Sequence, residues 1–432
     1  MDVVLTNASP IMLGPPSPPA APHLGTLYTL SLLDAAKRMS AYLGRPALVP
    51  EAWNLSSRRI ESQFADEGEE YFNYCAGAVA QARSILAKFG IDLDQDVPVR
   101  DDVHESRVEL QSAVVELCER GEIAERRVEE KWCFPCQLAL PATSATTVCF
   151  QCGKDLQLRQ TTDWFLRLDT FQIFERAIAV RWNPPYALRR FQNLKDINPW
   201  YRVQHGNRRL GVPSPLSCGQ ILDPRLVAAL YPTVLRGRGF TGPITLFAGM
   251  DIQRKWLVLT LGANRSDALP VGIVNHGVLL DASGRKLSRY TGASIADSSE
   301  TSEFTNVRAA LLSCTLGKDI VAARIPIAAA SRLREKAVNC LKYLRLQPTV
   351  PDSAGVDVDS GMREALGRVD QALIAGDVTA ALAYFRKAVV KTLSNDLIPQ
   401  VRKQGLRRCE QTQKRLEILF TIFFGPEPRL HG

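Results

Sequence analysis

Two segments that lie far apart in the chain carry side chains suited to binding phosphate groups. The first runs from Gly14 through a proline-rich stretch to His23-Leu-Gly-Thr26, and an apolar helical pattern continues from there to Leu43. The N-terminus of a helix binds anions through free N–H groups and the positive end of the helix dipole. Gly25 lets a ligand approach the backbone, while His23 and Thr26 bring donors for phosphate oxygens. A capped helix after a proline turn, without any ligand, accounts for this segment alone equally well.

The second segment, residues 275–289, indicates a strand, a tight Asp281-Ala-Ser-Gly284 turn and a short basic loop. Lys286, Ser288 and Arg289 lie in that loop. A basic loop at this position is expected to close over phosphates held by the first segment.

A third segment, Thr245-Leu-Phe-Ala-Gly-Met-Asp251, indicates a buried strand that runs into a glycine turn. An acidic residue after such a strand accepts hydrogen bonds from ribose hydroxyls. We therefore expect Asp251 to bind the ribose of a nucleotide, and the alternative is that Asp251 caps a following helix, which has the same local geometry.

Together these segments resemble the signatures of class I aminoacyl-tRNA synthetases. His23-Leu-Gly-Thr26 and Lys286-Leu-Ser-Arg-Tyr290 correspond to the two signatures usually written HIGH and KMSKS. Pro15-Pro-Ser-Pro18, His276-Gly277 and Gly249-Met-Asp-Ile252 are similar to segments of the methionyl branch. The resemblance implies that an amino-acid carboxylate attacks the α-phosphorus of ATP, which gives an aminoacyl-adenylate and pyrophosphate.

The resemblance also assigns roles to individual residues. The catalytic set that it implies is His23, Thr26, Lys286 and Arg289. The ATP-binding set that it implies, with Mg²⁺ bound alongside ATP, adds Pro16, Ser17, Gly25, Gly249, Asp251, His276 and Ser288. Thr26, Arg289 and Tyr290 depart from the family signatures, so we expect slower activation rather than its loss.

The predicted amino-acid pocket is where the chain departs furthest from the methionyl pattern. Methionyl-type enzymes carry an aspartate after the second strand, and the corresponding position here is Trp53, with Glu51 two residues earlier. If the strand is regular, Glu51 points to the same face as Trp53 and supplies the carboxylate. Ile221-Leu-Asp223 stands where the family has a Trp-Leu-Asp-Ala-Pro segment. The expected pocket residues are Ser17, Glu51, Trp53, Ile221 and Asp223.

Four of the ten cysteines form two C-x-x-C motifs. Cys133 and Cys136 are separated by twelve residues from Cys149 and Cys152, and Gly153 follows the second motif. Four thiolates at this spacing suit a tetrahedral zinc ion with a structural role, since four ligands leave no open position. The alternatives are a redox pair, or cysteines retained after loss of the metal. Methionyl-type synthetases carry such a knuckle in the peptide that connects the halves of their nucleotide-binding fold.

The leading hypothesis is a stand-alone methionyl-tRNA synthetase-like paralogue in specialised metabolism (natural product biosynthesis). The altered pocket favours it. So does the lack of a tryptophan after Trp256, because the methionyl family that the chain resembles reads its anticodon partly by stacking a base on a tryptophan of the bundle. In this hypothesis the adenylate passes to an N-hydroxylated amine for hydrazine (N–N bond) formation, with a separate cupin protein as partner. Two alternatives stay open: a methionyl-type ligase that charges tRNA, and a non-catalytic RNA- or protein-binding relic.

These residues must be positioned by alternating strands and helices, which predicts an α/β fold. The expected architecture is a Rossmann-type nucleotide-binding fold, split by a zinc-knuckle connective insert and followed by an all-α bundle. The predicted limits are 1–125 and 161–300 for the two catalytic halves, 126–160 for the insert, and 301–432 for a shortened anticodon-type bundle. Helices are expected at 66–90 and 104–122, and a first strand at residues 2–6.

The length and composition of the chain limit the number of domains and the classes of partner that we expect. The 432 residues are 46% hydrophobic, and the chain is long enough for two or three domains. A net charge of +8 favours a polyanionic partner such as tRNA. No apolar run reaches the roughly 20 residues that a membrane helix needs, and the first residues lack the pattern of a signal peptide. We therefore expect a cytoplasmic protein without a membrane partner.

Overall fold

The structure is a computed structural model. It describes residues 8–14, 22–56, 60, 64, 67–136, 138–142, 144–149, 152–192, 198–206, 208–252, 256–287, 301–346, 349–350, 360–399 and 408–426. Four of the predicted site residues lie outside this part: Pro16, Ser17, Ser288 and Arg289. The strand expected at residues 2–6 also lies outside it, and the first described strand is β1 (Ile11–Leu13).

A parallel sheet forms the centre of the α/β body. Its hydrogen-bonded strands, in spatial order, are β1, β11 (Ile244–Gly249), β12 (Gly272–His276) and β7 (Arg181–Asn183). A second parallel pair consists of β2 (Pro50–Trp53) and β3 (Asp94–Arg100). Leu48 joins the two groups, because its backbone forms hydrogen bonds of 2.7 and 2.8 Å with Pro10 and Met12 beside β1.

The combined strand order is therefore β3-β2-β1-β11-β12-β7. The connections change direction between β1 and β11, and in open parallel sheets this is where ligands bind, outside the carboxyl ends of the strands. The α/β fold expected from the sequence is confirmed, and its strand order places the switch point beside the segments that were singled out for phosphate binding.

Helices follow the strands and cover the sheet. They are α1 (Leu24–Tyr42), α3 (Glu69–Lys88), α4 (His104–Glu119), α5 (Thr170–Ala179), α6 (Ala187–Gln192), α7 (Pro224–Ala229), α8 (Tyr231–Gly237), α9 (Val258–Ala263) and the short 3₁₀ turn η2 (Ser266–Ala268). The helices expected at 66–90 and 104–122 correspond to α3 and α4, with ends that differ by up to three residues. Cys75 is buried in the core that α3 shares with α1.

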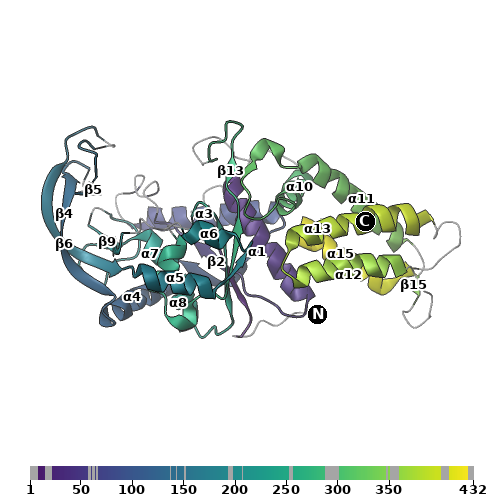
Figure 1. The fold of residues 1–432 in the computed structure, drawn as a ribbon, viewed down its shortest axis with the longest axis horizontal. Coiled ribbons are helices and arrows are strands. Elements are labelled where there is room, and N and C mark those ends of the chain that lie inside the picture. The colour runs from purple at the N-terminus through teal and green to yellow at the C-terminus, as the bar shows by residue number, and fades with distance from the viewer. Residues whose placement is uncertain are drawn as a thin grey trace.

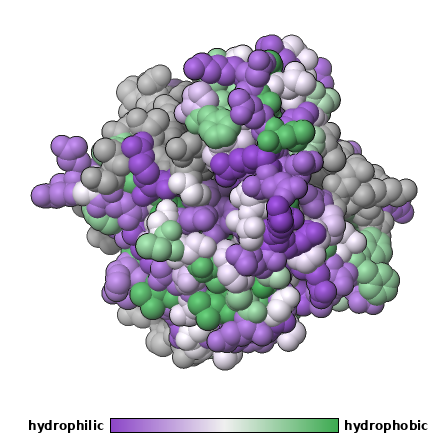
Figure 2. Space-filling model, turned by 90° about the vertical axis from the view of Figure 1, so that its left-hand side faces the viewer, coloured by the Kyte–Doolittle hydropathy of each residue, from purple (hydrophilic) through white to green (hydrophobic). Residues whose placement is uncertain are grey.

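An antiparallel sheet projects from one end of the body (Figure 1). It contains β5 (Leu138–Pro141), β4 (Ile123–Cys133), β6 (Gln157–Arg167) and β8 (Trp200–Arg202) in that order. The long strands β4 and β6 run without a break across the predicted insert limits at residues 126 and 160. Figure 2 views the molecule from this end and shows a largely hydrophilic surface with scattered hydrophobic side chains.

The chain after residue 300 is mainly helical. Its elements are α10 (Thr301–Leu312), η4 (Ala322–Arg324), α11 (Ile327–Arg345), α12 (Ser360–Ile374), α13 (Val378–Lys387), the π-helical segment η6 (Ala388–Leu397) and α15 (Glu410–Phe424). Short strand pairs complete the fold: β9 (Gln204–His205) with β10 (Ile221–Leu222), β13 (Leu279–Leu280) with β14 (Ile320–Val321), and β15 (Thr349–Val350) with β16 (Arg408–Cys409). No helix in the described ranges is long and apolar enough to span a bilayer.

One hydrophobic core joins these C-terminal helices to α1 and α3. Figure 1 shows α1 lying beside the C-terminal helices. The rings of Phe89, just after α3, and Phe304, in α10, are 4.9 Å apart. A fully buried ion pair lies in the same interface, where Arg308 of α10 contacts Asp34 of α1 at 2.6 Å. The helical segment is therefore packed into the α/β body rather than attached through a polar boundary.

Candidate active site

A cavity of about 290 Å³ opens at the switch point of the parallel sheet. It lies beside the start of α1 and the carboxyl ends of β2, β11 and β12, and a loop after β13 completes it. The polar or glycine residues that line it are His23, Gly25, Thr26, Thr29, Gly249, Asp251, His276, Gly277 and Lys286. Its apolar lining consists of Leu30, Ala52, Trp53, Ile252, Val278, Leu279 and Leu287. The structure thus brings together residues from the three segments that the sequence analysis singled out.

His23 caps the N-terminus of α1, which begins at Leu24, earlier than the helical pattern expected to follow Thr26. Its Nδ1 accepts hydrogen bonds from the N–H groups of Gly25 and Thr26 at 3.0 and 3.3 Å. A neutral imidazole that accepts at Nδ1 carries its proton on Nε2, so the cap makes Nε2 the donor of the ring. A side chain on Gly25 would place its Cβ 2.9 Å from Cε1 of His23, so the glycine makes room for this ring.

The cap changes one expectation from the sequence. Two of the backbone N–H groups at the start of α1, which were expected to bind an anion, are already hydrogen-bonded to His23. The donors at this helix end are consequently side chains, and Thr26 Oγ1 lies 3.5 Å from Nε2 of His23.

A buried hydrogen bond ties α1 to the end of β12. His276 is buried, and its Nδ1 lies 2.8 Å from the carbonyl oxygen of Gly277. Nδ1 therefore carries the proton, and Nε2 accepts from the Thr29 hydroxyl at 2.7 Å. Burial lowers the pKa of His276, so the ring is neutral at pH 7. Thr29 was missed by the sequence analysis, although its place one helical turn after Thr26 puts it on the same face of α1.

Gly249 and Asp251 form the turn at the end of β11. A Cβ at position 249 would lie 2.5 Å from Oδ1 of Asp251 and 3.0 Å from Cε1 of His276. Only glycine fits between these two groups without displacing them. The capping alternative for Asp251 depends on residues 253–255, which lie outside the described residues, and helical structure is already present at Trp256, before α9 (Val258–Ala263).

The predicted turn at 281–284 is present and positions Lys286. Asp281 accepts hydrogen bonds from the Ser283 hydroxyl and the Arg285 backbone N–H at 2.7 and 2.9 Å, which helps to lower its pKa to about 2. Gly284 adopts a φ of 80°, a conformation that suits glycine. The backbone then leads Lys286 to the cavity, where its ammonium forms an ion pair with Asp251. The ion pair joins the two groups expected to bind phosphate and ribose.

Glu51 does not line the cavity, in contrast to its expected role. The pairing of β2 with β3 shifts register between Pro50 and Ala52, so the strand is irregular at Glu51 and the condition for a shared face fails. Both oxygens of the Glu51 carboxylate accept hydrogen bonds of 2.7 Å from Arg83. Burial alone would raise the pKa of Glu51, but Arg83 and Arg100 lower it. Ala52 and Trp53 form the cavity wall instead.

Ile221 and Asp223 also lie outside the cavity lining. Ile221 packs against Gly211, and Asp223 caps α7 by accepting the N–H of Arg225 at 2.8 Å. The Asp223 carboxylate also accepts a hydrogen bond of 2.7 Å from the Tyr201 hydroxyl, and its Oδ2 lies 2.8 Å from Nε2 of His205. Because the N–H of Leu226 also donates to it, the Asp223 carboxylate has four partners. Asp223 therefore holds this loop together and does not line the cavity.

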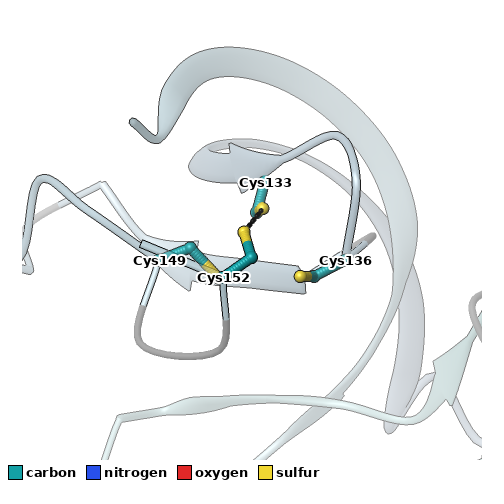
Figure 3. Close-up of side chains that lie close together, drawn as sticks. All are labelled: Cys133, Cys136, Cys149 and Cys152. Carbon is teal, nitrogen blue, oxygen red and sulfur yellow. Dashed lines mark hydrogen bonds between the residues drawn. The ribbon is translucent and has the colours of Figure 1, made fainter. Parts of the chain in front are cut away.

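The four cysteines of the C-x-x-C motifs meet at the tip of the β4–β6 sheet. Their sulfur atoms lie within 4.8 Å of one another and turn toward a common centre (Figure 3). Cys133 and Cys152, one from each motif, have sulfurs 3.5 Å apart. Gly153 has a φ of 71° and donates its N–H to the Cys149 carbonyl at 2.8 Å, which closes the second turn. This cluster can hold a metal ion.

Comparisons with known proteins agree with this geometry. Residues 15–181, which are less than half of the chain, match the family profile "tRNA synthetases class I (M)". A leucine–tRNA ligase of Nitratidesulfovibrio vulgaris (strain DP4) is 22% identical over 157 residues, which are 36% of this chain and only 19% of that ligase.

Two solved structures are similar over almost the whole chain. Methionyl-tRNA synthetase of Mycobacterium tuberculosis bound by methionyl-adenylate has a TM-score of 0.70 at 14% identity and covers 96% of this chain and 92% of its own. The agnB2 LeuRS of Agrobacterium radiobacter K84, in a ternary complex with tRNA and LeuAMS, has a TM-score of 0.70 at 12% identity and covers 96% and 83%. At these identities the structures show a shared fold, and with the family profile they confirm the resemblance to class I aminoacyl-tRNA synthetases.

Proposed function

We propose that this class I aminoacyl-tRNA synthetase-like protein activates a carboxylic acid of the amino-acid type with ATP and forms an acyl-adenylate. The observation that carries the proposal is the convergence on one cavity of groups from three segments: His23 and Thr26 at the start of α1, Asp251 in the turn after β11, and Lys286 in the loop after β13. These groups match the parts of ATP: cationic and N–H donors for the phosphates, and an acceptor for ribose hydroxyls.

The proposed reaction needs no covalent intermediate with the protein. The substrate carboxylate attacks the α-phosphorus, the bond to the bridging oxygen breaks, and pyrophosphate leaves with its charge. His23 Nε2–H and the Lys286 ammonium stabilise the negative charge that develops on the phosphates, and positioning lowers the rest of the barrier. In this proposal Lys286 exchanges Asp251 for the phosphates, which leaves Asp251 to accept from ribose. Mg²⁺ bound with ATP would neutralise part of the phosphate charge.

For the cysteine cluster we propose a structural zinc site. A tetrahedral site with Zn–S distances of about 2.3 Å requires sulfurs about 3.8 Å apart, and the observed cluster lies within 4.8 Å. Zinc would supply folding energy to a hairpin tip that has little core of its own. In this site Cys133, Cys136, Cys149 and Cys152 are the ligands and the metal takes no part in activation.

The zinc proposal predicts about one zinc ion per chain in purified protein, measured by inductively coupled plasma mass spectrometry. Cys149→Ser is expected to lose most of the metal, because three remaining thiolates bind zinc less tightly. Cys218→Ser is the matched control, since Cys218 is an exposed thiol elsewhere on the surface, and it should keep its zinc. Equal zinc content in the two variants, or none in the parent protein, would rule the site out.

The activated acyl group must be transferred to an acceptor, for which there are two hypotheses, beside a third in which the protein is not catalytic. We favour a role in specialised metabolism, with transfer to an N-hydroxylated amine and a separate cupin protein as partner, because the pocket departs from the methionyl pattern. The alternative is transfer to tRNA, which the net charge of +8 favours. A non-catalytic RNA- or protein-binding relic is the third hypothesis, and the substitutions at Thr26 and Tyr290 are its support.

ATP–pyrophosphate exchange without tRNA tests the activation step. We expect exchange that depends on one or a few acids from a panel of amino acids and their derivatives. Exchange with methionine alone would favour the tRNA-charging alternative, and hydroxylamine or tRNA added afterwards would then identify the acceptor. If zinc-loaded, folded protein shows no exchange with any acid, the result would favour the non-catalytic RNA- or protein-binding relic.

A further inference from the structure

A buried hydrogen bond between Thr29 and His276 connects the helix that carries the phosphate donors to the central sheet. Thr29 lies on α1 and is 6% exposed, and His276 ends β12 and is 4% exposed. Oγ1 of Thr29 and Nε2 of His276 are 2.7 Å apart. Both residues line the cavity, so a change in this contact alters the shape of the proposed nucleotide site.

The surroundings of the His276 ring decide the direction of this hydrogen bond. Nδ1 of His276 lies 2.8 Å from the carbonyl oxygen of Gly277, which can only accept, so Nδ1 carries the proton. Burial lowers the pKa of His276, and Nε2 of the neutral ring is therefore an acceptor. Thr29 must donate its hydroxyl proton to His276.

Thr29 uses its hydroxyl differently from an ordinary helical threonine. Such a side chain commonly donates to the carbonyl oxygen one turn earlier in its own helix. That carbonyl, of Gly25, is 3.3 Å from Oγ1 of Thr29, whereas Nε2 of His276 is 2.7 Å away. Thr260 in α9 shows the ordinary case, with its hydroxyl 2.8 Å from the carbonyl oxygen of Trp256. Since a hydroxyl has one proton, the proton of Thr29 serves the contact with β12.

The His276 ring borders the turn that carries Asp251. Its centroid is 4.4 Å from that of the Tyr28 ring of α1. A Cβ on Gly249 would lie 3.0 Å from Cε1 of His276 and 2.5 Å from Oδ1 of Asp251, so the ring, the glycine and the carboxylate follow one another closely. The N–H of Met250 also donates to the His276 carbonyl at 3.0 Å. A displaced His276 ring would therefore press on the turn after β11.

We propose that Thr29 is a positioning residue for ATP, whose hydroxyl fixes the His276 ring and thereby sets the spacing between the donors of α1 and the Asp251 turn. The inference rests on the proposed binding of ATP in this cavity and adds a residue outside the signature segments. Removing the hydroxyl leaves Nε2 buried without a donor, which is unfavourable. The ring then leaves its position and ATP binds less tightly, while the groups that act on the phosphates stay in place.

Isothermal titration with ATP, in the absence of any acid, tests the proposal. Thr29→Val keeps the branched side chain but removes the hydroxyl, and it is expected to raise the Kd for ATP at least about fivefold. Thr29→Ser restores the hydroxyl and should stay within about twofold of the wild type. Thr260→Val is the matched control, because it removes a fully buried helical hydroxyl outside the cavity lining, and it should leave the Kd unchanged. An unchanged Kd in folded Thr29→Val, or an equal loss in Thr260→Val, would overturn the proposal.

Kinetics of ATP–pyrophosphate exchange separate this inference from the proposed activation. Thr29→Val should raise KM for ATP at least about fivefold and leave kcat within about threefold of the wild type. A fall in kcat at unchanged KM would contradict a positioning role in binding. Wild-type protein that binds ATP without exchange would contradict the activation alone, and the comparison of Kd values would still decide the inference. Wild-type protein that does not bind ATP would overturn both.

The protonation of the His276 ring gives a test on the wild-type protein, without dependence on the folding of a variant. The chain has five histidines, so nuclear magnetic resonance of protein labelled with ¹⁵N-histidine resolves them, and His276→Gln identifies the signals of His276. At pH 7 we expect a proton on Nδ1 and a hydrogen-bonded acceptor at Nε2. Thr29→Val should move the Nε2 signal toward that of a nitrogen without a hydrogen bond, and Thr29→Ser should not. A proton on Nε2 in the wild type would show that Thr29 is not the donor and would overturn the proposal.

Discussion

Replacing Arg308 with leucine is expected to lower the free energy of unfolding by about 3–5 kcal/mol, the usual cost of removing one partner of a buried ion pair. Both side chains of the Arg308–Asp34 pair are 0% exposed. Burial alone would raise the pKa of Asp34, but the guanidinium groups of Arg308 and Arg38 lower it. Removing Arg308 leaves a buried carboxylate with Arg38 as its remaining cationic partner among the described residues.

Arg308 also connects three parts of the chain. Its guanidinium donates to the carbonyl oxygens of Gly90, Ile422 and Phe423, at 3.2, 2.8 and 3.3 Å. These carbonyls lie after α3 and in the last turn of α15, so the variant also loses hydrogen bonds that fix α15 against the α/β body. We expect the loosened interface to expose the shared core of α1, α10 and α15.

Urea denaturation followed by circular dichroism measures this effect. The matched control is Arg345→Leu, which removes a partly exposed pair with Glu417 and should cost no more than about 1 kcal/mol. Asp34→Asn combined with Arg308→Leu should cost less than the sum of the single variants, because no buried carboxylate then lacks its partner. An Arg308→Leu effect no larger than that of Arg345→Leu would contradict the interpretation.

Replacing Lys286 with alanine is expected to lower kcat/KM for ATP–pyrophosphate exchange by about 10²–10³-fold, the usual effect of removing one preorganised donor to developing charge. Two effects act together here. The phosphates lose a cation, and the carboxylate of Asp251 loses its ion-pair partner at the mouth of the cavity. Repulsion between this carboxylate and the triphosphate should also raise KM for ATP.

The neighbouring Arg285 provides the control for Lys286. Its side chain is 80% exposed and pairs with Asp281 in the turn rather than with a cavity residue. Arg285→Ala should change exchange by less than about fivefold. Similar losses in the two variants would indicate that the loop acts through net charge, whereas a loss confined to Lys286→Ala supports a direct contact with phosphate.

The features that were predictable from the sequence depend on residues close together in the chain. The turn that presents Lys286 is built by Asp281, Ser283 and Gly284 within four positions. The cap of α1 likewise involves His23 and the two N–H groups just after it, although its use of those N–H groups was not foreseen. Four cysteines in two short motifs were expected to form one cluster, and they do.

The features that were missed depend on distant partners. Glu51 was assigned to the pocket on the assumption of a regular strand, but the irregular pairing with β3 and the contacts with Arg83 and Arg100 turn it away. Thr29 was overlooked because its partner, His276, lies 247 residues later in the chain. Helical spacing places Thr29 on the same face of α1 as Thr26, but no local sequence pattern indicates the distant partner of Thr29 or of Glu51.

By itself the sequence determined which segments carry the phosphate-binding groups and the metal-ligating thiols, because helix caps, tight turns and C-x-x-C motifs are set by neighbouring residues. Only the tertiary structure decided which carboxylates remain in contact with the cavity. Burial makes an unpaired carboxylate costly, so Glu51 and Asp101 are bound by donors from other parts of the chain. Asp251, paired with Lys286 at the mouth of the cavity, is the acid that a ligand can reach among the described lining residues.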